Sequence, residues 1–136
     1  MGIHFWLYVS RSTILQTDAD SVIEEIVGFS QARNAGLGIT GALVFSDLHF
    51  GQIIEGPAES IMTLRSSILR DPRHTDVRTI SDGKTASRRF GHWALAYAGA
   101  SIVISRALQR AMRDAAHNKA EAGDDLLSLM DEALAA

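Results

Sequence analysis

The stretch ITGALVFSDLHFGQIIEGP, residues 39–57, decides the fold. Two apolar runs, 39–46 and 49–55, have the length and the β-branched and aromatic content of strands. Between them Asp47-Leu48 is a short polar break, so the stretch is predicted to be a β-hairpin. Gly56-Pro57 then closes the second strand and begins a helix, because proline suits the first helical turn.

An amphipathic helix flanks this hairpin on either side. The downstream helix carries apolar residues at helical spacing, namely Ile61, Leu64 and Ile68. It stops at Asp71-Pro72, because a residue that precedes proline disfavours the helical conformation. The upstream helix is predicted over 20–34, where Ser21 and Glu24 have the spacing of a capping box and Ala35-Gly36 ends the apolar stripe.

Three further strands complete the pattern. Residues 3–10 alternate two apolar faces and read as an interior strand, and 77–80 and 91–98 read as strands on either side of the polar turn 82–89. The order βαββαββ is the ferredoxin-like plan, an α+β class with both helices on one face of a mixed sheet. The chain therefore divides into 1–98, the sheet domain, and a C-terminal helical extension.

The extension, residues 99–136, has helical spacing throughout, with Asp124 predicted to cap its last helix. If two helices cover one sheet face, the face that carries Phe5, Leu7 and Val9 is left exposed. We expect the C-terminal helices, or a partner chain, to cover it. This gives the extension a capping role and a possible role in signalling.

Composition excludes several classes of site. The 136 residues carry 13 Lys and Arg against 16 Asp and Glu, a net charge of −3, and no cysteine. Thiolate metal sites, cysteine nucleophiles and disulfides are therefore excluded. The five histidines lack metal-ligand spacing, and neither a phosphate-binding loop nor a hydrolase motif is present. The histidine spacing argues against a metal site. No leader or membrane segment and no basic aromatic stripe is found, so we expect a cytoplasmic protein that binds neither membrane nor nucleic acid.

Three polar side chains are predicted to point into the helix-covered layer. Gln52 shares a strand face with Phe50 and Ile54, Tyr8 faces inward by the same alternation, and Asn34 lies on the inward stripe of the first helix. A buried amide without a partner costs about 1–3 kcal/mol, so each needs one. Two interpretations remain open: a closed structural network, or a planar polar ligand sandwiched by the apolar side chains of Ile23, Ile68 and Leu95.

Several segments resemble the BLUF family of flavin-binding blue-light sensors, in its short single-domain form. They occur in order over about residues 3–98 and are Leu7-Tyr8-Val9-Ser10, Asn34, Gly38-Ile39-Thr40-Gly41-Ala42-Leu43, Phe50-Gly51-Gln52-Ile53-Ile54-Glu55-Gly56-Pro57, Asp71-Pro72-Arg73-His74, Arg89-Phe90 and Trp93. The resemblance implies a noncovalently bound flavin, usually FAD, with FMN or riboflavin as alternatives.

The resemblance also implies roles for individual residues. Tyr8 would donate an electron and a proton to the photoexcited flavin, and Gln52 would bridge that phenol and the ring before rotating or tautomerising. Asn34 would hold the carbonyl edge of the ring. Trp93 and Leu95 would relay the signal. Three residues match positions near the ring edge or the polar tail: Arg33, Arg73 and His74.

The chain departs from the family pattern at three places. Tyr8 and Asn34 are 26 residues apart, two more than the family leads us to expect, and an ungapped alignment would place Ser10 at the donor position. We assign the donor to Tyr8, because Tyr-Val-Ser matches a common form of this strand and serine cannot donate an electron. Leu95 replaces a common methionine, which loses an adaptable thioether. Gly51 replaces a bulkier residue and is expected to loosen its strand.

The function predicted from the resemblance is a blue-light photoreceptor, a switch rather than an enzyme. It would signal to a separate effector or through its own oligomer, a homodimer or higher homo-oligomer. The alternative is a ferredoxin-like interaction or small-ligand regulatory module with a degenerate, non-photoactive flavin site. An acylphosphatase-like enzyme using Arg11 and Asn34 lacks the glycine-rich anion loop that this chemistry requires.

Overall fold

The computed structural model describes residues 2–46, 48–99, 101–117 and 119–134, so Asp47 of the predicted hairpin turn lies outside the described residues. A short 3-10 turn, η1 (Gln16–Asp18), precedes the first helix. The strands are β1 (Ile3–Ser12), β2 (Thr40–Phe45), β3 (His49–Gly56), β4 (His74–Thr85) and β5 (Ala96–Ala98). The helices are α1 (Ala19–Leu37), α2 (Ala58–Leu69), α3 (Ile102–Asp114) and α4 (Lys119–Ala133).

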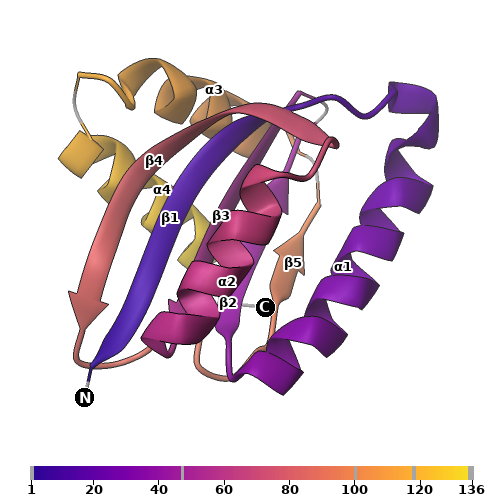
Figure 1. Cartoon of the computed structure of the whole chain (residues 1–136). Helices are drawn as coiled ribbons and strands as arrows, with labels where there is room; N and C mark the ends of the chain where they lie inside the picture. The colour runs from indigo at the N-terminus through magenta and orange to yellow at the C-terminus, as the bar shows by residue number, and fades with distance from the viewer. Residues whose placement is uncertain (1, 47, 100, 118, 135–136) are drawn as a thin grey trace.

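The strands form one five-stranded sheet in the order β4-β1-β3-β2-β5 (Figure 1). All neighbours are antiparallel except β2 and β5, which are parallel. β3 is central, and its register places Gln52 opposite Tyr8 of β1 and Leu43 of β2. The predicted ferredoxin-like plan is confirmed, and it brings the phenol and the amide together in the middle of the sheet.

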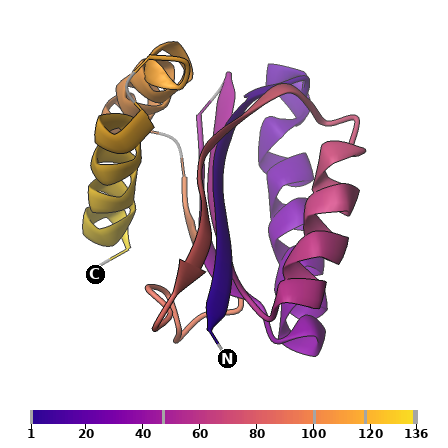
Figure 2. The same cartoon turned by 60° about the vertical axis from the view of Figure 1, so that its left-hand side comes forward.

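Helices cover both faces of the sheet (Figure 2). α1 and α2 lie on one face, above the side chains of Trp6, Tyr8 and Ile54. α3 and α4 lie on the other, where Leu108 and Leu126 pack with Leu7 and Val9 of β1 in one apolar cluster. The C-terminal helices therefore cover the face that the sequence left open, as expected.

Gly51 has a different role from the one that the sequence suggested. It lies within a fully paired part of β3, opposite Val9 and Val44. A Cβ at this position would lie 2.7 Å from Cδ2 of Leu108. The glycine thus lets α3 approach the sheet closely, which a bulkier residue would prevent.

Both predicted helix caps are wrong. α1 begins at Ala19, and Ser21 lies in its first turn, where Oγ donates to the Asp18 carbonyl at 3.1 Å. α1 also passes Ala35 and ends at Gly38, whose φ of 69° is left-handed and favours glycine. Asp124 lies inside α4. Local spacing misplaced these ends because the helices continue to bury side chains beyond the capping signals.

The last two strands differ in length from the prediction. β4 extends to Thr85, because its pairing with β1 continues along nearly the whole of β4. The strand therefore includes polar residues that were predicted to form a turn. β5 is only three residues long, and 91–95 are not strand. There the carbonyls of Ala94 and Leu95 accept hydrogen bonds from side chains of α1, at 2.9 and 3.0 Å, in place of a strand partner. None of the described helices is long and apolar enough to cross a membrane.

Candidate functional site

A cavity opens between α1 and α2 above the centre of the sheet. Its empty volume is about 460 Å³, counted to its open mouth. Apolar walls and polar groups alternate around it, and the lining residues are Tyr8, Ile26, Ser30, Arg33, Leu43, Phe50, Gln52, Ile68, Asp71, Arg73 and His74. Both helices, four strands and the α2–β4 connection contribute, so the tertiary fold builds this site.

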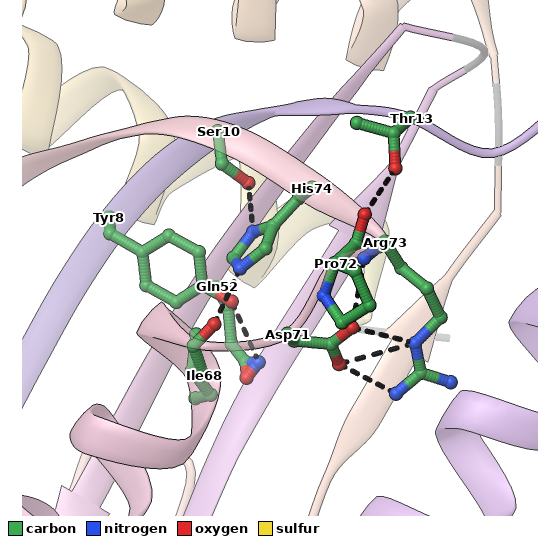
Figure 3. Close-up of polar contacts among 9 residues, drawn as sticks. All are labelled: Tyr8, Ser10, Thr13, Gln52, Ile68, Asp71, Pro72, Arg73 and His74. Atoms are coloured by element: carbon green, nitrogen blue, oxygen red, sulfur yellow. Dashed lines mark hydrogen bonds and ion pairs between the residues drawn. The ribbon is translucent and has the colours of Figure 1, made fainter.

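Tyr8 and Gln52 meet on the floor of the cavity (Figure 3). The Nε2 amide group of Gln52 donates to the Tyr8 hydroxyl at 3.4 Å. Tyr8 is only 3% exposed. Burial raises the pKa of its phenol well above the ordinary value, and the negative charge of Asp71 adds to this rise. The charge of Arg33 and the hydrogen bond from Gln52 lower the pKa, but more weakly. The phenol is therefore neutral and keeps its proton at any physiological pH.

Aromatic and hydrogen-bonded neighbours fix the phenol ring. Trp6 stacks on Tyr8 with ring centroids 4.4 Å apart, and the His74 ring meets it edge-on at 6.0 Å. The Nε2 nitrogen of His74 lies 2.7 Å from the Ile68 carbonyl, which can only accept, so Nε2 carries a hydrogen. In the neutral ring Nδ1 then accepts from the Ser10 hydroxyl, 2.7 Å away (Figure 3). Of the two candidate donors, Tyr8 lines the cavity, whereas Ser10 is engaged with His74.

Charged groups stand at the rim. Asp71 and Arg73 form an ion pair with distances of 2.6 to 3.2 Å (Figure 3). This hydrogen bonding lowers the pKa of Asp71 against the opposing effect of burial, and it raises the pKa of Arg73. Burial lowers the pKa of Arg33, which still lies far above neutrality as a guanidinium. The rim therefore offers cationic donors from α1 and from the α2–β4 connection.

Asn34 lies beside the cavity but is not among its lining residues. It is 1% exposed; its amide group donates to the Ala94 carbonyl at 2.9 Å, and its Oδ1 accepts from Arg33 at 3.3 Å. In this arrangement the amide attaches α1 to the 91–95 segment. Leu95 is buried in an apolar cluster with Phe50 and other residues, and Trp93 is 44% exposed on the surface.

Of the three aliphatic residues predicted to flank a ring, Ile23, Ile68 and Leu95, only Ile68 lines this cavity. Ile23 instead lines a second cavity, on the side of α1 that faces β5. The sequence reasoning missed five lining residues, which are Ile26, Ser30, Leu43, Phe50 and Asp71. Ile26 and Ser30 lie on the inward stripe of the first helix, and Phe50 shares the face of Gln52, so the periodicity held a signal for them.

A buried carboxylate organises the segment that leads from β4 to β5. Glu55 is 1% exposed, and its two oxygens accept the backbone N–H groups of Arg89 and Phe90 at 2.5 and 2.9 Å and the Thr40 hydroxyl at 3.2 Å. The Arg88 guanidinium adds bonds to the Thr40 hydroxyl and the Glu55 carbonyl. Glu55 thus anchors the chain that carries Trp93 and Leu95.

The cavity suits a planar heteroaromatic ring with polar edges. Ile26 and Ile68 offer apolar surface from opposite helices, which matches the faces of such a ring. An amide, a phenol and guanidinium groups can meet carbonyl and ring-nitrogen edges, and the cationic rim can meet a phosphate-bearing tail. Within the described residues no group of acidic or histidine side chains could hold a metal ion.

Comparison with known proteins agrees with this chemistry. The family model BLUF, described as sensors of blue light using FAD, matches residues 3–96. The antirepressor BluF of Escherichia coli K12, described as blue light- and temperature-regulated, is 35% identical over 83 residues, which are 61% of this chain and 21% of that protein. The photoactivated adenylate cyclase subunit beta of Euglena gracilis is 31% identical over 87 residues, 64% of this chain and 10% of that protein.

Solved structures extend the likeness to the C-terminal helices. The dark-state structure of the BLUF protein BlrB has a TM-score of 0.79 and 28% identity, and the match covers 98% of either chain. The ground state of BlsA, 21% identical with a TM-score of 0.78 over 98% of this chain and 89% of the other, shares the fold. The chain spans about a fifth or less of the length of the curated relatives above.

Proposed function

The chain belongs to the BLUF family, the sensors of blue light using FAD, and on this premise we propose that Tyr8 and Gln52 are its photoactive pair. The observation that supports the assignment is the 3.4 Å contact between the Gln52 amide and the Tyr8 hydroxyl on the cavity floor. The chain is a light sensor and not an enzyme, since the family is one of sensors and the match to the cyclase subunits covers only 8–10% of their length.

When bound, FAD supplies the absorption of blue light and an electron acceptor in its excited state. Tyr8 would give up an electron and its proton and would take both back on recombination, so the light state would differ from the dark state only in its hydrogen bonds. Burial favours this role, because a neutral phenol keeps its proton until it is oxidised. Trp6, stacked on Tyr8, fixes the orientation of the ring from which the electron leaves.

Gln52 is the switch. In the structure its Nε2 group donates to the phenol, and a half-turn of the carboxamide, or its tautomerisation, would present an acceptor to the phenol instead. Both arrangements use a hydrogen bond between Tyr8 and Gln52, so they differ little in energy and their populations can be shifted. The result is a changed hydrogen-bond pattern without net chemistry.

Other residues would bind the cofactor. Ile68 and Ile26 would flank the ring, and Asn34 and Arg33, bonded to each other, would meet its carbonyl edge after a small rearrangement of the Asn34 amide. Arg73 and His74 would face the ring edge or the polar tail. Ile23 of α1 would support the ring indirectly, since it packs in the same apolar cluster as Leu43 and Phe50, which line the cavity.

The signal would leave through the 91–95 segment. Asn34 and Gln31 hold the carbonyls of Ala94 and Leu95, so a change at the ring edge would be passed to Leu95, Trp93 and β5. We assign 1–98 to the photosensory domain and 99–136 to a helical extension that packs on the opposite face and transmits the change. The named relatives are a light-regulated antirepressor and a photoactivated cyclase subunit. For this chain we propose that the signal goes to a separate effector protein or through its own oligomer, and a cytoplasmic location stays a prediction.

The light-minus-dark absorption spectrum tests the assignment. The purified chain, supplemented with FAD, is expected to be yellow and to shift its flavin absorption slightly to the red under blue light, with recovery in the dark. Tyr8→Phe and Gln52→Leu should bind flavin but lose the shift. Ser10→Ala is the matched control and should retain it. A shift retained in Tyr8→Phe would refute the donor assignment, and a protein that stays colourless would support the degenerate-site alternative.

A further inference from the structure

A second cavity lies on the other side of α1, beside β5 at the edge of the sheet. Figure 1 shows α1 running alongside β5 at this edge. The cavity is larger than the one that holds Tyr8 and Gln52, with an empty volume of about 1100 Å³ counted to its open mouth. Its lining residues are Ala19, Asp20, Ile23, Glu24, Val27, Gly28, Gln31, Phe45, Tyr97 and Gly99. We call it the α1–β5 groove.

The groove joins an apolar floor to an acidic wall. Ile23, Val27 and Phe45 provide the apolar surface. Asp20 and Glu24 are exposed and stand one helical turn apart, and neither makes an ion pair within the described part of the chain. No basic residue lines the groove. An occupant that fits must therefore bring apolar side chains together with positive charge.

α3 of this chain carries that combination on its outer face. Ile102 and Val103 are 67% and 62% exposed, which is high for two adjacent aliphatic side chains. Arg106 and Arg110 follow on the same stripe, one helical turn apart, and both are exposed and unpaired among the described residues. The arginine spacing on α3 thus equals the carboxylate spacing on α1.

The two surfaces lie close together in the chain. Gly99 lines the groove, and α3 begins three residues later at Ile102. A molecule that carries a groove and its complement at one edge can engage a second copy twice, with each copy giving its helix and receiving the other's. Such a reciprocal contact has two-fold symmetry, the commonest symmetry of soluble homo-oligomers.

We propose that the α1–β5 groove binds the start of α3 from a second copy, so that the chain forms a two-fold dimer. Ile102 and Val103 enter the apolar part of the groove, and Arg106 and Arg110 pair with Glu24 and Asp20. The apolar pair supplies most of the affinity, and the charges select the partner and the register. The inference concerns assembly and does not depend on the photoactive roles proposed above.

Charge reversal tests the proposal, with the mass measured by sedimentation equilibrium in the dark. The full-length chain is expected to be dimeric, and the variants Asp20→Arg/Glu24→Arg and Arg106→Glu/Arg110→Glu should each weaken the dimer at least about tenfold. An equimolar mixture of the two variants should recover the dimer, because each mixed dimer then pairs opposite charges at both contacts. Glu59→Arg/Asp124→Arg, which makes the same charge change as the first variant at exposed carboxylates that line neither the groove nor the hollow beside Val103, should leave the dimer intact.

Circular dichroism and flavin absorption would verify that each variant is folded. If a charge-reversal variant does not fold, the neutral variant Asp20→Asn/Glu24→Gln is tested in its place. A chain that stays monomeric up to about 1 mM would overturn the proposal, and the groove would then be open to another partner. A dimer that survives both reversals, or a mixture that stays monomeric, would overturn it equally. Assembly that keeps growing beyond the dimer would contradict the two-fold arrangement.

Discussion

Replacing Glu55 with glutamine should loosen the segment that leads to β5. The carboxylate has three donors: Phe90 N–H and the Thr40 hydroxyl at one oxygen, and Arg89 N–H at the other. A carboxamide has nearly the same shape but only one oxygen. Its best orientation keeps the first two bonds and turns an NH₂ group toward the Arg89 N–H, so one donor loses its acceptor and faces another donor.

The cost follows from the loss of a hydrogen bond to a charged group. Glu55 is 1% exposed, whereas Arg89 is an exposed residue, so water can replace only part of the missing bond from the Arg89 side. A hydrogen bond to a charged group is worth about 1.5–3 kcal/mol, so a loss of about 1–3 kcal/mol is expected. That is a substantial part of the roughly 5–15 kcal/mol by which a domain of this size is stable. Urea unfolding, followed by circular dichroism, should show this loss in the free energy of unfolding without a change in slope.

Hydrogen exchange would show where the loss occurs. The amide of Arg89 should exchange faster in Glu55→Gln, and the amides at the centre of β3 should change only through the global stability. Glu132→Gln, at an exposed carboxylate, is the control and should change stability by less than about 0.5 kcal/mol. If Glu55→Gln falls within that same range and Arg89 keeps its protection, then the carboxylate does not anchor this segment.

Three further outcomes are expected. Gly51→Ala should destabilise the protein by about 1–3 kcal/mol in urea unfolding, because its Cβ would lie 2.7 Å from Leu108; an unchanged midpoint would show that α3 moves away freely. In a titration followed by tyrosine absorption, Tyr8 should stay protonated above pH 10. Since the unfolded phenol titrates near its ordinary pKa of 10.0, stability should fall as pH rises past that value, and Tyr8→Phe should remove this contribution. The depressed pKa of Asp71 contributes stability that is present above its ordinary pKa of 3.8 and is lost on acidification, so Asp71→Asn should be less stable than the wild type at pH 7 but not at pH 2. An equal difference at both pH values would contradict the ion pair with Arg73.

The sequence alone determined the plan of the sheet and much of the site. Strand alternation placed Tyr8 and Gln52 on the helix-covered face, and helical spacing placed Asn34 on the inward side of the first helix, because both patterns depend only on residues near in the chain. The coverage of the Leu7 and Val9 face by the C-terminal helices followed from the same reasoning, since an exposed apolar sheet face needs a cover.

Only the tertiary structure decided the contacts between distant segments. Side chains of α1 bond the carbonyls of Ala94 and Leu95, where a longer β5 would have had a strand partner, and Trp93 keeps a backbone bond to Gly41 of β2. Pairing with β1 extends β4 through residues that look like a turn. The close approach of α3 explains Gly51, and the bond to His74 separates Ser10 from the cavity that Tyr8 lines. These features depend on which groups meet after the chain has folded, and local periodicity carries no information about partners 40 to 70 residues away in the chain, such as Gln52 for Tyr8 or His74 for Ser10.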